Sequence, residues 1–374
     1  ADRGFTLHVG KDHAITAEQC RVLDVESGCQ PDGTRQIVLR LRHDASGLEL
    51  CLAYTLAAND FFARKTLAVR NPSEENAATL YRAEIERIQT DATLELGGQG
   101  QPVFVGGRLF LGLEYPAGQN QVDENRVCLA HFPGKRLGRD WLELKTAVIG
   151  VAGRGSVEDA FAEYVRRIRI PPRSWVLYNS WYDIRRPEMS NEVFIECFDE
   201  FRRLLIDKYG VKLDSFVVDD GYQDRQSIWK TDLSVVPGDF GKLADHLRKH
   251  GCRFGIWMPL TAPAPYLDVD WGKAQGYEVV DSGTRYCISG PKYRADLKRA
   301  IAHHIERFGL NYYKHDFNGF GCAVAGHGHL PESVYGFESN VDAYIETLQY
   351  ARQLNPDVFL NVTGGMWLSP WWLM

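Results

Sequence analysis

The second half of this 374-residue chain alternates short apolar runs with helical segments, and this alternation restricts the fold more than any other feature. The apolar runs are nearly continuous, as in strands that are buried on both faces. Helix-capping signals delimit the segments between them, such as Ser190 before the first helix and Gly210, Gly251 and Gly309 after later ones. Expected strands span 174–181, 215–220, 253–260, 311–318 and 357–362, and expected helices span 190–209, 240–250, 293–308 and 340–354. Strands that alternate with helices predict a parallel sheet.

Residues at the ends of these strands decide between a closed barrel and an open sheet. All five carboxyl ends carry polar or aromatic side chains, at 181–183, 219–220, 257, 314–316 and 363–365. In a (β/α)8 barrel such ends meet at one pocket. An open dinucleotide-binding sheet would need a GxGxxG turn after its first strand, and the sequence has none there. The sequence therefore predicts an α/β protein with a (β/α)8 TIM barrel.

The barrel is expected to be incomplete. A full barrel takes about 250 residues and eight strand–helix units, whereas the expected units after Pro172 number five. The chain stops within the apolar run 367–374, WLSPWWLM, which would expose a large apolar patch. We therefore expect an N-terminal portion of a longer protein, with its barrel cut after about five strands.

A β-rich region precedes the barrel. Runs at 36–43, 48–56, 61–71, 80–91 and 102–115 have strand composition, and Asp32-Gly33 and Asn71-Pro72 read as turns. A helix is expected at 157–168, with acidic residues early and arginines late, and Pro171-Pro172 ends it. The predicted domains are an N-terminal β-sandwich at 1–155, a linker helix region at 156–173 and the catalytic-type barrel at 174–374.

The octet 311–318, NYYKHDFN, carries the strongest chemical signal. Lys314 and Asp316 share one face of a strand, because side-chain direction repeats every second residue, and Asn318 shares it if the strand continues. A cation beside a carboxylate keeps it ionised near neutral pH, as a nucleophilic Asp requires. A buried Lys–Asp ion pair that only shapes a loop is the alternative, and the octet alone leaves both open.

Composition excludes several classes of partner. A net charge of -6 with mixed signs favours neither nucleic acid nor an anionic membrane, and there is no run of about 18 apolar residues. The eight cysteines include no CxxC pair and are interpreted as isolated core thiols, with a Cys20–Cys29 disulfide as the alternative. His315, His327 and His329 near Asp316 lack a helical HxxxH spacing, so we expect no metal and no cofactor. The compartment stays open between secreted or periplasmic and cytoplasmic.

Five motifs, in order along the chain, resemble those of glycoside hydrolase family 36, the α-galactosidases or melibiases of clan D. They are NSWYD at 179–183, FVVDDGYQD at 216–224, FGIWMP at 254–259, YYKHDFN at 312–318 and NVTGG at 361–365. The resemblance runs from about residue 174 to the end, and the preceding β-domain matches that family's N-terminal β-sandwich in position and class.

This resemblance implies a role for each matched residue. Asp316 would be the nucleophile of a retaining enzyme that removes terminal α-linked galactose through a glycosyl-Asp intermediate. The resemblance also implies a set of substrate-binding residues, namely Trp181, Asp219, Asp220, Trp257, Lys314, Asn318, Thr363 and Gly364.

Three positions depart from the family's pattern. His315 replaces the usual Trp before the nucleophile, and strand three ends in MPL where the family commonly has Pro-Glu. The segment 362–366, VTGGM, stands where the family has Cys-Ser-Gly-Gly-Gly, so the Cys that helps to read the sugar's 2-position is replaced. The alternatives are therefore an α-N-acetylgalactosaminidase, a raffinose-synthase-like transglycosylase or an inactive sugar-binding barrel. The family's acid/base Asp would fall beyond Met374, so this chain alone is expected to be inactive. The expected partner is a carbohydrate substrate, and a homo-oligomer stays open.

Overall fold

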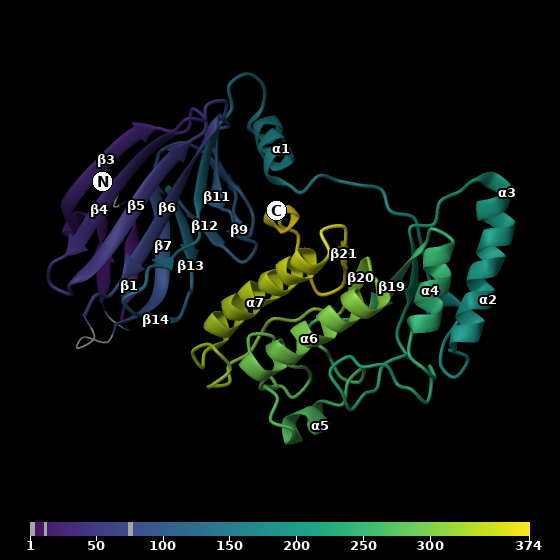
Figure 1. Ribbon diagram of the computed structural model, residues 1–374. Coiled ribbons are helices and arrows are strands. Elements are labelled where there is room, and N and C mark those ends of the chain that lie inside the picture. Colours follow the sequence, from purple (N-terminus) through teal and green to yellow (C-terminus); the bar gives the residue numbers. More distant parts are fainter. Residues whose placement is uncertain (1–3, 11–12, 74–77) are drawn as a thin grey trace. The chain divides into compact units, whose positions relative to one another are not determined.

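The computed structural model describes residues 4–10, 13–73 and 78–374; residues 1–3, 11–12 and 74–77, which the expected first domain includes, lie outside the described residues. The chain divides into two compact units (Figure 1). One comprises Ala1–Pro172 with Trp367–Met374, and the other comprises Arg173–Met366. Within the described residues, no helix is both long and apolar enough to cross a bilayer.

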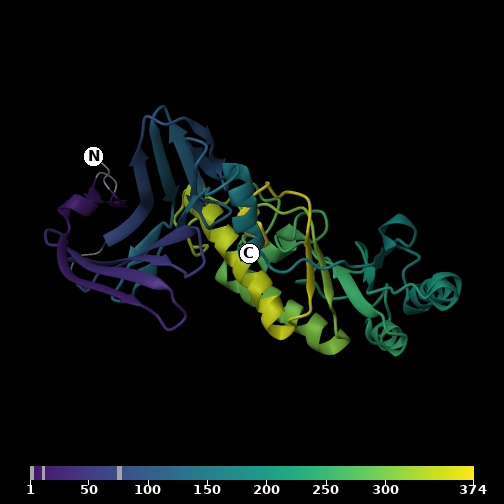
Figure 2. The same ribbon diagram turned by 90° about the horizontal axis from the view of Figure 1, so that it is seen from above.

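The first unit contains two antiparallel sheets, whose strands Figures 1 and 2 show from two directions. In the described residues one sheet contains β1 (Thr6–Val9), β2 (Ala14–Thr16), β7 (Ala78–Gln89), β9 (Gly98–Gln99), β12 (Gln119–Asp123), β13 (Arg126–His131) and β14 (Lys135–Leu137). The other contains β3 (Arg21–Cys29), β4 (Arg35–His43), β5 (Leu48–Leu56), β6 (Phe62–Arg70), β8 (Leu94–Leu96), β10 (Val103–Val105), β11 (Leu109–Leu113), β15 (Leu142–Glu143) and β16 (Ala147–Val151). Lys65 of β6 and Glu86 of β7 join the sheets through a buried ion pair of 3.0 Å. The β-rich first region is therefore confirmed.

The C-terminal apolar run is packed into the first unit, contrary to the expectation that it would lie exposed. Trp371, in the short 3-10 helix η4 (Pro370–Leu373), is 3% exposed and packs against Phe110 and Tyr164. Its indole Nε1 donates to the Tyr164 hydroxyl at 3.0 Å. Tyr164 belongs to α1 (Val157–Ile168), which has the predicted bounds. Leu368, Leu373 and Met374 are exposed, at 90%, 42% and 46%, so the run is exposed only in part.

The disulfide alternative for Cys20 and Cys29 is wrong. Both thiols are free, and they flank the ends of β3, whose nine residues span about 30 Å in extended conformation. A disulfide needs Cα atoms within about 7 Å of each other. The interpretation of all eight cysteines as isolated core thiols also needs correction, because Cys29 is exposed and because Cys287 and Cys322 lie in one cluster with two histidines.

The second unit is a parallel half-barrel. Its strands, in spatial order, are β17 (Leu177–Asn179), β18 (Ser215–Val218), β19 (Arg253–Trp257), β20 (Tyr312–His315) and β21 (Phe359–Val362). Its α-helices are α2 (Asn191–Phe201), α3 (Asp207–Tyr209), α4 (Gly241–Lys249), α5 (Val269–Ala274), α6 (Pro291–Phe308) and α7 (Ser333–Leu354). Helices α6 and α7 lie side by side in both views (Figures 1 and 2). The parallel sheet is confirmed, whereas its closure into an eight-stranded barrel stays a prediction.

Four of the five strands end two or three residues earlier than the apolar pattern predicts, because the residues at their ends leave the ladder, whereas β21 ends at Val362 as predicted. The strand expected at 311–318 is β20, which stops at His315, so that Asp316 and Asn318 lie in the following loop. The helix expected at 340–354 begins at Ser333. The predicted caps are confirmed at Gly210 and Gly309, which have positive φ angles of 66° and 62°.

Candidate functional site

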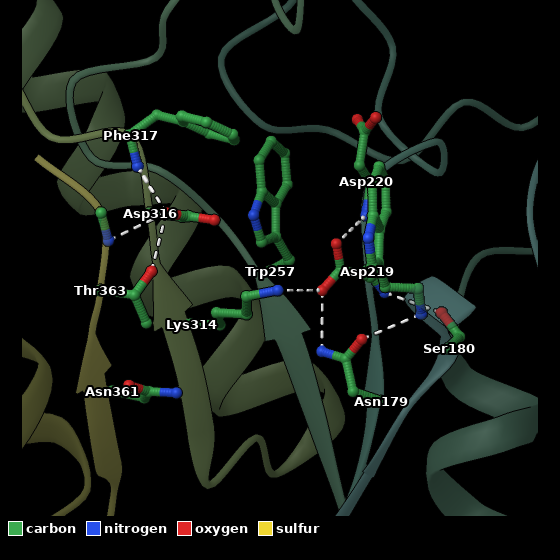
Figure 3. Close-up of polar contacts among 12 residues, drawn as sticks. Asn179, Ser180, Asp219, Asp220, Trp257, Lys314, Asp316, Phe317, Asn361 and Thr363 are labelled. Carbon is green, nitrogen blue, oxygen red and sulfur yellow. Dashed lines mark hydrogen bonds and ion pairs between the residues drawn. The ribbon is translucent and has the colours of Figure 1, made fainter.

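The carboxyl ends of the five parallel strands bring the candidate residues to one end of the half-barrel (Figure 3). Asn179 ends β17, Asp219 follows β18, Trp257 ends β19, and Thr363 follows β21. Lys314 lies within β20, with Asp316 just beyond it. The register pairs Trp257 with Lys314 and Val362 with His315, which places the motif residues of neighbouring strands beside one another.

Asp219 is the centre of a buried ion-pair network. Its Oδ2 accepts from Lys314 Nζ at 2.9 Å and from Asn179 Nδ2 at 2.7 Å. Its own backbone N–H donates to the Ser180 hydroxyl at 3.0 Å, and the residue is only 2% exposed. The expected pairing of Lys314 with Asp316 is thus corrected: the ammonium group binds Asp219 across to β18, because Asp316 has left the strand on which the two would share a face.

Asp316 is held by three donors that all reach the same oxygen. Oδ1 accepts from the Thr363 hydroxyl at 2.7 Å, from the Phe317 backbone N–H at 2.9 Å and from the Gly364 backbone N–H at 3.1 Å. Figure 3 shows the second oxygen turned toward the indole of Trp257. Burial alone would raise the pKa of Asp316. Hydrogen bonds from Thr363, Phe317 and Trp257, with the charge of Lys314, outweigh burial and hold this pKa below its usual range.

An aromatic group lies beside this carboxylate. The Trp257 ring is 1% exposed and meets the Tyr266 ring edge-on, with 4.9 Å between centroids. Tyr266 stacks on Phe317 at 5.2 Å. Burial first, and then the negative charges of Asp220, Asp316 and Asp219, raise the pKa of Tyr266, so its hydroxyl is exposed to the field of all three carboxylates. The rings of Tyr266 and Phe317 thus pack against each other beside the buried Trp257 ring.

Asp220 faces a cavity of about 350 Å³, at the small end of the range for small-molecule sites. The cavity is lined by Trp181, Arg185, Arg186, Asp220, Gly221, Gln223, Arg225, Pro265 and Tyr266. Gln223 Nε2 donates to Asp220 Oδ1 at 2.6 Å. Burial, with repulsion from Asp219, raises the pKa of Asp220, so its carboxyl protonates more readily than that of Asp316. One face of Trp181 is covered by the Arg185 guanidinium, 4.0 Å from the ring centroid.

Asn318 and Gly364 shape the site from behind the carboxylate. Asn318 is 6% exposed, and its Nδ2 donates to the backbone carbonyl of Gly364 at 3.0 Å and to that of His315 at 3.3 Å. A Cβ on Gly364 would lie 2.7 Å from Asp316 Oδ1, so the absence of a side chain lets the strand end approach the carboxylate. His315 is buried, and its Nδ1 lies 2.7 Å from the Met258 carbonyl.

Sequence reasoning missed several residues of the site. Asn179 and Gln223 lie within the motifs at 179–183 and 216–224, whereas Tyr266 lies between β19 and α5, outside all five motifs. Arg185, Arg186 and Arg225 also line the cavity. Their position within the motifs could have indicated Asn179 and Gln223, whereas the segment that carries Tyr266 has no periodic pattern that would place this residue.

Three solved structures share the fold of the chain. A glycoside hydrolase family 36 α-galactosidase from Geobacillus stearothermophilus matches with a TM-score of 0.70 and 13% identity, over 99% of this chain and 63% of that protein. The α-galactosidase from Lactobacillus brevis matches with a TM-score of 0.69 and 13% identity, over 96% and 59%. A variant of the Geobacillus enzyme in complex with raffinose matches with a TM-score of 0.72 and 12% identity, over 99% and 63%.

These matches concern the fold. The chain spans less than two thirds of the length of each of the three proteins. No protein-family model matches the sequence, and neither does any curated protein. The resemblance to family 36 α-galactosidases that the five motifs predict is confirmed in the fold, at an identity of 12 to 13%.

Proposed function

We propose that this protein is a retaining glycoside hydrolase that acts on terminal α-linked galactose, with Asp316 as its nucleophile. The observation that carries the proposal is the anchored carboxylate at the end of β20, where three hydrogen bonds fix Oδ1 and the pKa lies below the usual range. A nucleophilic carboxylate must be ionised and fixed in orientation before the sugar arrives. Asp316 meets both requirements.

The proposed reaction has two steps. Asp316 attacks the anomeric carbon while a second carboxyl group, about 5 Å away, protonates the departing oxygen; water then hydrolyses the glycosyl-Asp ester. Asp219 does not suit the acid role, because its Oδ2 already accepts from Lys314 and Asn179. We assign Lys314 and Asn179 to positioning Asp219, and we leave the acid unassigned.

The cavity beside Asp220 is the proposed sugar site. A carboxylate and an amide, from Asp220 and Gln223, suit the hydroxyl groups of a sugar, and the rings of Trp181 and Tyr266 suit its apolar face. Variants of the Geobacillus enzyme were crystallised with raffinose and with stachyose, which supports a carbohydrate ligand for a site on this fold. Closure of the half-barrel into a full (β/α)8 barrel, preceded by a β-sandwich, is part of the same proposal.

A trapping experiment tests the nucleophile without needing the acid. The reagent is a 2-deoxy-2-fluoro-α-galactosyl sugar that carries a trinitrophenolate leaving group. This leaving group departs without protonation, so a chain that has only the nucleophile can still react. We expect an intact-mass increase of one fluorosugar, mapped to the peptide with Asp316. Asp316→Asn should give no adduct. Asp245→Asn, which changes an exposed carboxylate on α4, should react as the unmodified chain does.

The failed outcomes separate the alternatives. A protein that binds galactose but forms no adduct would be a sugar-binding barrel without this chemistry. A protein that neither binds galactose nor reacts with the 2-fluoro reagent, but is trapped by a 5-fluoro-N-acetyl-α-galactosaminyl fluoride, would shift the substrate and keep the nucleophile. Absence of binding and of reaction with both reagents would overturn the proposal.

A further inference from the structure

Four potential metal ligands converge in a part of the half-barrel that the proposed chemistry does not use. Cys287 lies in the loop between α5 and α6, and Cys322, His327 and His329 lie in the loop between β20 and α7. One ligand atom from each of the four lies within 4.8 Å of the others. Both cysteines are buried and both histidines are partly buried. The sequence suggested His315 and Asp316 as neighbours of the two histidines, whereas in the structure the two histidines lie beside Cys287 and Cys322.

The distances match a tetrahedral zinc site. Cys287 Sγ lies 3.5 Å from His329 Nε2, and Cys322 Sγ lies 3.4 Å from His327 Nδ1. With Zn–S bonds of about 2.3 Å and Zn–N bonds of about 2.0 to 2.1 Å, a tetrahedral angle places sulfur and nitrogen about 3.6 Å apart. The side chains would therefore need only a small movement to bind an ion at their centre.

The surrounding hydrogen bonds orient the ligands. His329 Nδ1 lies 2.7 Å from the Leu330 carbonyl, so it is the protonated nitrogen and Nε2 keeps its lone pair for the centre of the cluster. The Ser289 hydroxyl lies 3.2 Å from Cys287 Sγ and donates to the His327 carbonyl at 3.2 Å, so it links the segments that carry two of the ligands. In its thiol form Cys287 donates to Asn340 Oδ1 at 3.2 Å, and that proton is the one that metal binding would displace.

The backbone around the cluster is closely packed. Gly328, between the two histidines, has a positive φ of 84°, and a Cβ there would lie 2.7 Å from the Ser289 carbonyl. A Cβ on Gly336, in the first turn of α7, would lie 1.9 Å from the Cys322 carbonyl and 2.9 Å from His329 Cε1. Val280 and Val324 pack against the two cysteines and form an apolar shell. Both glycines thus allow a close approach that brings the ligands together.

We propose that Cys287, Cys322, His327 and His329 form a structural zinc site that ties the α5–α6 loop to the β20–α7 loop. Two thiolates and two imidazoles form a closed tetrahedral ligand set that suits zinc and leaves no position for a substrate. Residues 316–332 lie between β20 and α7 and contain no helix or strand, and a loop of that length in a compact domain is uncommon and usually functional. This loop begins with Asp316, so the metal would also order the segment that carries the proposed nucleophile.

A second histidine cluster has different surroundings and carries no such proposal. Asp199, His246 and His250 also bring their ligand atoms together, but the Arg202 guanidinium lies 2.9 and 3.1 Å from the two ring nitrogens of His250. A guanidinium is always charged and has no acceptor, so it repels a metal ion at that position.

Metal analysis tests the proposal independently of any glycosidase activity. The chain, purified without chelators, should contain about one zinc ion per molecule, and a mercurial reagent that modifies thiols should release it. Cys322→Ser and His329→Ala should each lose at least tenfold in zinc affinity. The control Cys252→Ser removes a buried thiol outside the cluster and should keep the ion. A strong chelator should lower the thermal midpoint of the wild type and of Cys252→Ser, but not that of Cys322→Ser.

Other results would overturn the site. These are a zinc-free chain that takes up none of an equimolar zinc addition, a Cys287–Cys322 disulfide in non-reducing peptide maps, or zinc retained with unchanged affinity in both cluster variants. If Cys322→Ser does not fold, the zinc content of the wild type and its release on thiol modification still decide. A metal-free chain that is trapped on Asp316 would disprove the zinc site alone, whereas a zinc-bound chain without an adduct would disprove the proposed nucleophile alone.

Discussion

The Thr363 hydroxyl, 2.7 Å from Asp316 Oδ1, stabilises the ionised carboxylate more than the protonated acid, because a hydrogen bond to a charged acceptor is stronger. Thr363→Val keeps the shape of the side chain and removes the donor, so we expect the pKa of Asp316 to rise. A hydrogen bond to a charged group contributes about 1.5 kcal/mol or more, which corresponds to about one pKa unit. The acidic limb of the trapping rate, measured by intact mass from pH 3 to 7, should therefore move up by about one unit.

The matched control for this substitution is Thr347→Val. The Thr347 hydroxyl is buried and donates to the Ala343 carbonyl within α7, so the change removes a comparable group away from Asp316. Its acidic limb should coincide with that of the unmodified chain. An unchanged limb in Thr363→Val would show that this hydroxyl does not set the ionisation of Asp316.

Lys314 matters at the residue scale because Asp219, its partner, is 2% exposed. Lys314→Met would leave a buried carboxylate with two neutral donors, the Asn179 amide and the Asp220 backbone N–H, and no cation. Breaking a buried pair on one side costs about 3 to 5 kcal/mol. Because a fifth of the Lys314 side chain is exposed, at 21%, we expect about 2 to 3 kcal/mol in urea unfolding. The double variant Lys314→Met/Asp219→Asn should recover part of the loss.

The comparison pair for Lys314 is Lys242 with Glu192, whose side chains are 63% and 62% exposed. Water solvates both charges there, so Lys242→Met should leave the urea midpoint essentially unchanged. If Lys314→Met behaves in the same way as Lys242→Met, the Asp219 network does not stabilise the half-barrel.

At the scale of elements, the residues that follow β21 and β20 lie in close contact, because Gly364 has no side chain between its backbone and Asp316. Gly364→Ala would place a Cβ 2.7 Å from Asp316 Oδ1 and push the carboxylate out of its position. Because a displacement of about 1 Å can reduce a rate about 100-fold, we expect a loss of that order in the trapping rate. Gly321→Ala is the control, since a Cβ there meets nothing within 4 Å in the loop that follows β20. Equal rates in the two variants would contradict this reading.

The elements also show what sequence could and could not predict. The apolar runs gave all five parallel strands, because strands buried on both faces need near-continuous apolar residues. The prediction that Lys314 lies beside Asp316 was wrong. Side chains alternate with a period of two only inside a strand, and β20 ends at His315. Cys287 and Cys322 were interpreted as isolated, since their meeting depends on two loops whose paths no local pattern specifies.

At the scale of the whole molecule, sequence predicted the kinds of element in each half better than their long-range partners. The β-rich first region and the parallel sheet follow from local composition and periodicity. The packing of Trp371 against Phe110 and Tyr164 joins residues more than two hundred positions apart, so the pattern WLSPWWLM alone suggested an exposed patch. Such contacts are decided by which apolar surface remains uncovered after the local elements have formed.

The stability of the second unit should fall as the solution is acidified from about pH 6.5 to about pH 4. Burial, and then the nearby His303, lowers the pKa of His304 to about 4, and burial lowers the pKa of His315 to about 4. In the unfolded chain both should titrate near 6.5. Between these values the unfolded chain binds protons that the folded chain does not, so acid favours unfolding, and above about pH 6.5 the effect vanishes.

Single substitutions separate this contribution from that of the carboxylates. His304→Gln removes one of the two buried rings, so its free energy of urea unfolding, followed by tryptophan fluorescence at pH 7, 6 and 5, should fall less steeply than that of the unmodified chain. His303→Gln changes the neighbouring side chain on α6, which is 54% exposed, and should keep nearly the original slope. Because the comparison is between slopes, a loss of stability common to all pH values does not affect it. Equal slopes in the three proteins would mean that the pKa of His304 is the same in the folded and the unfolded chain.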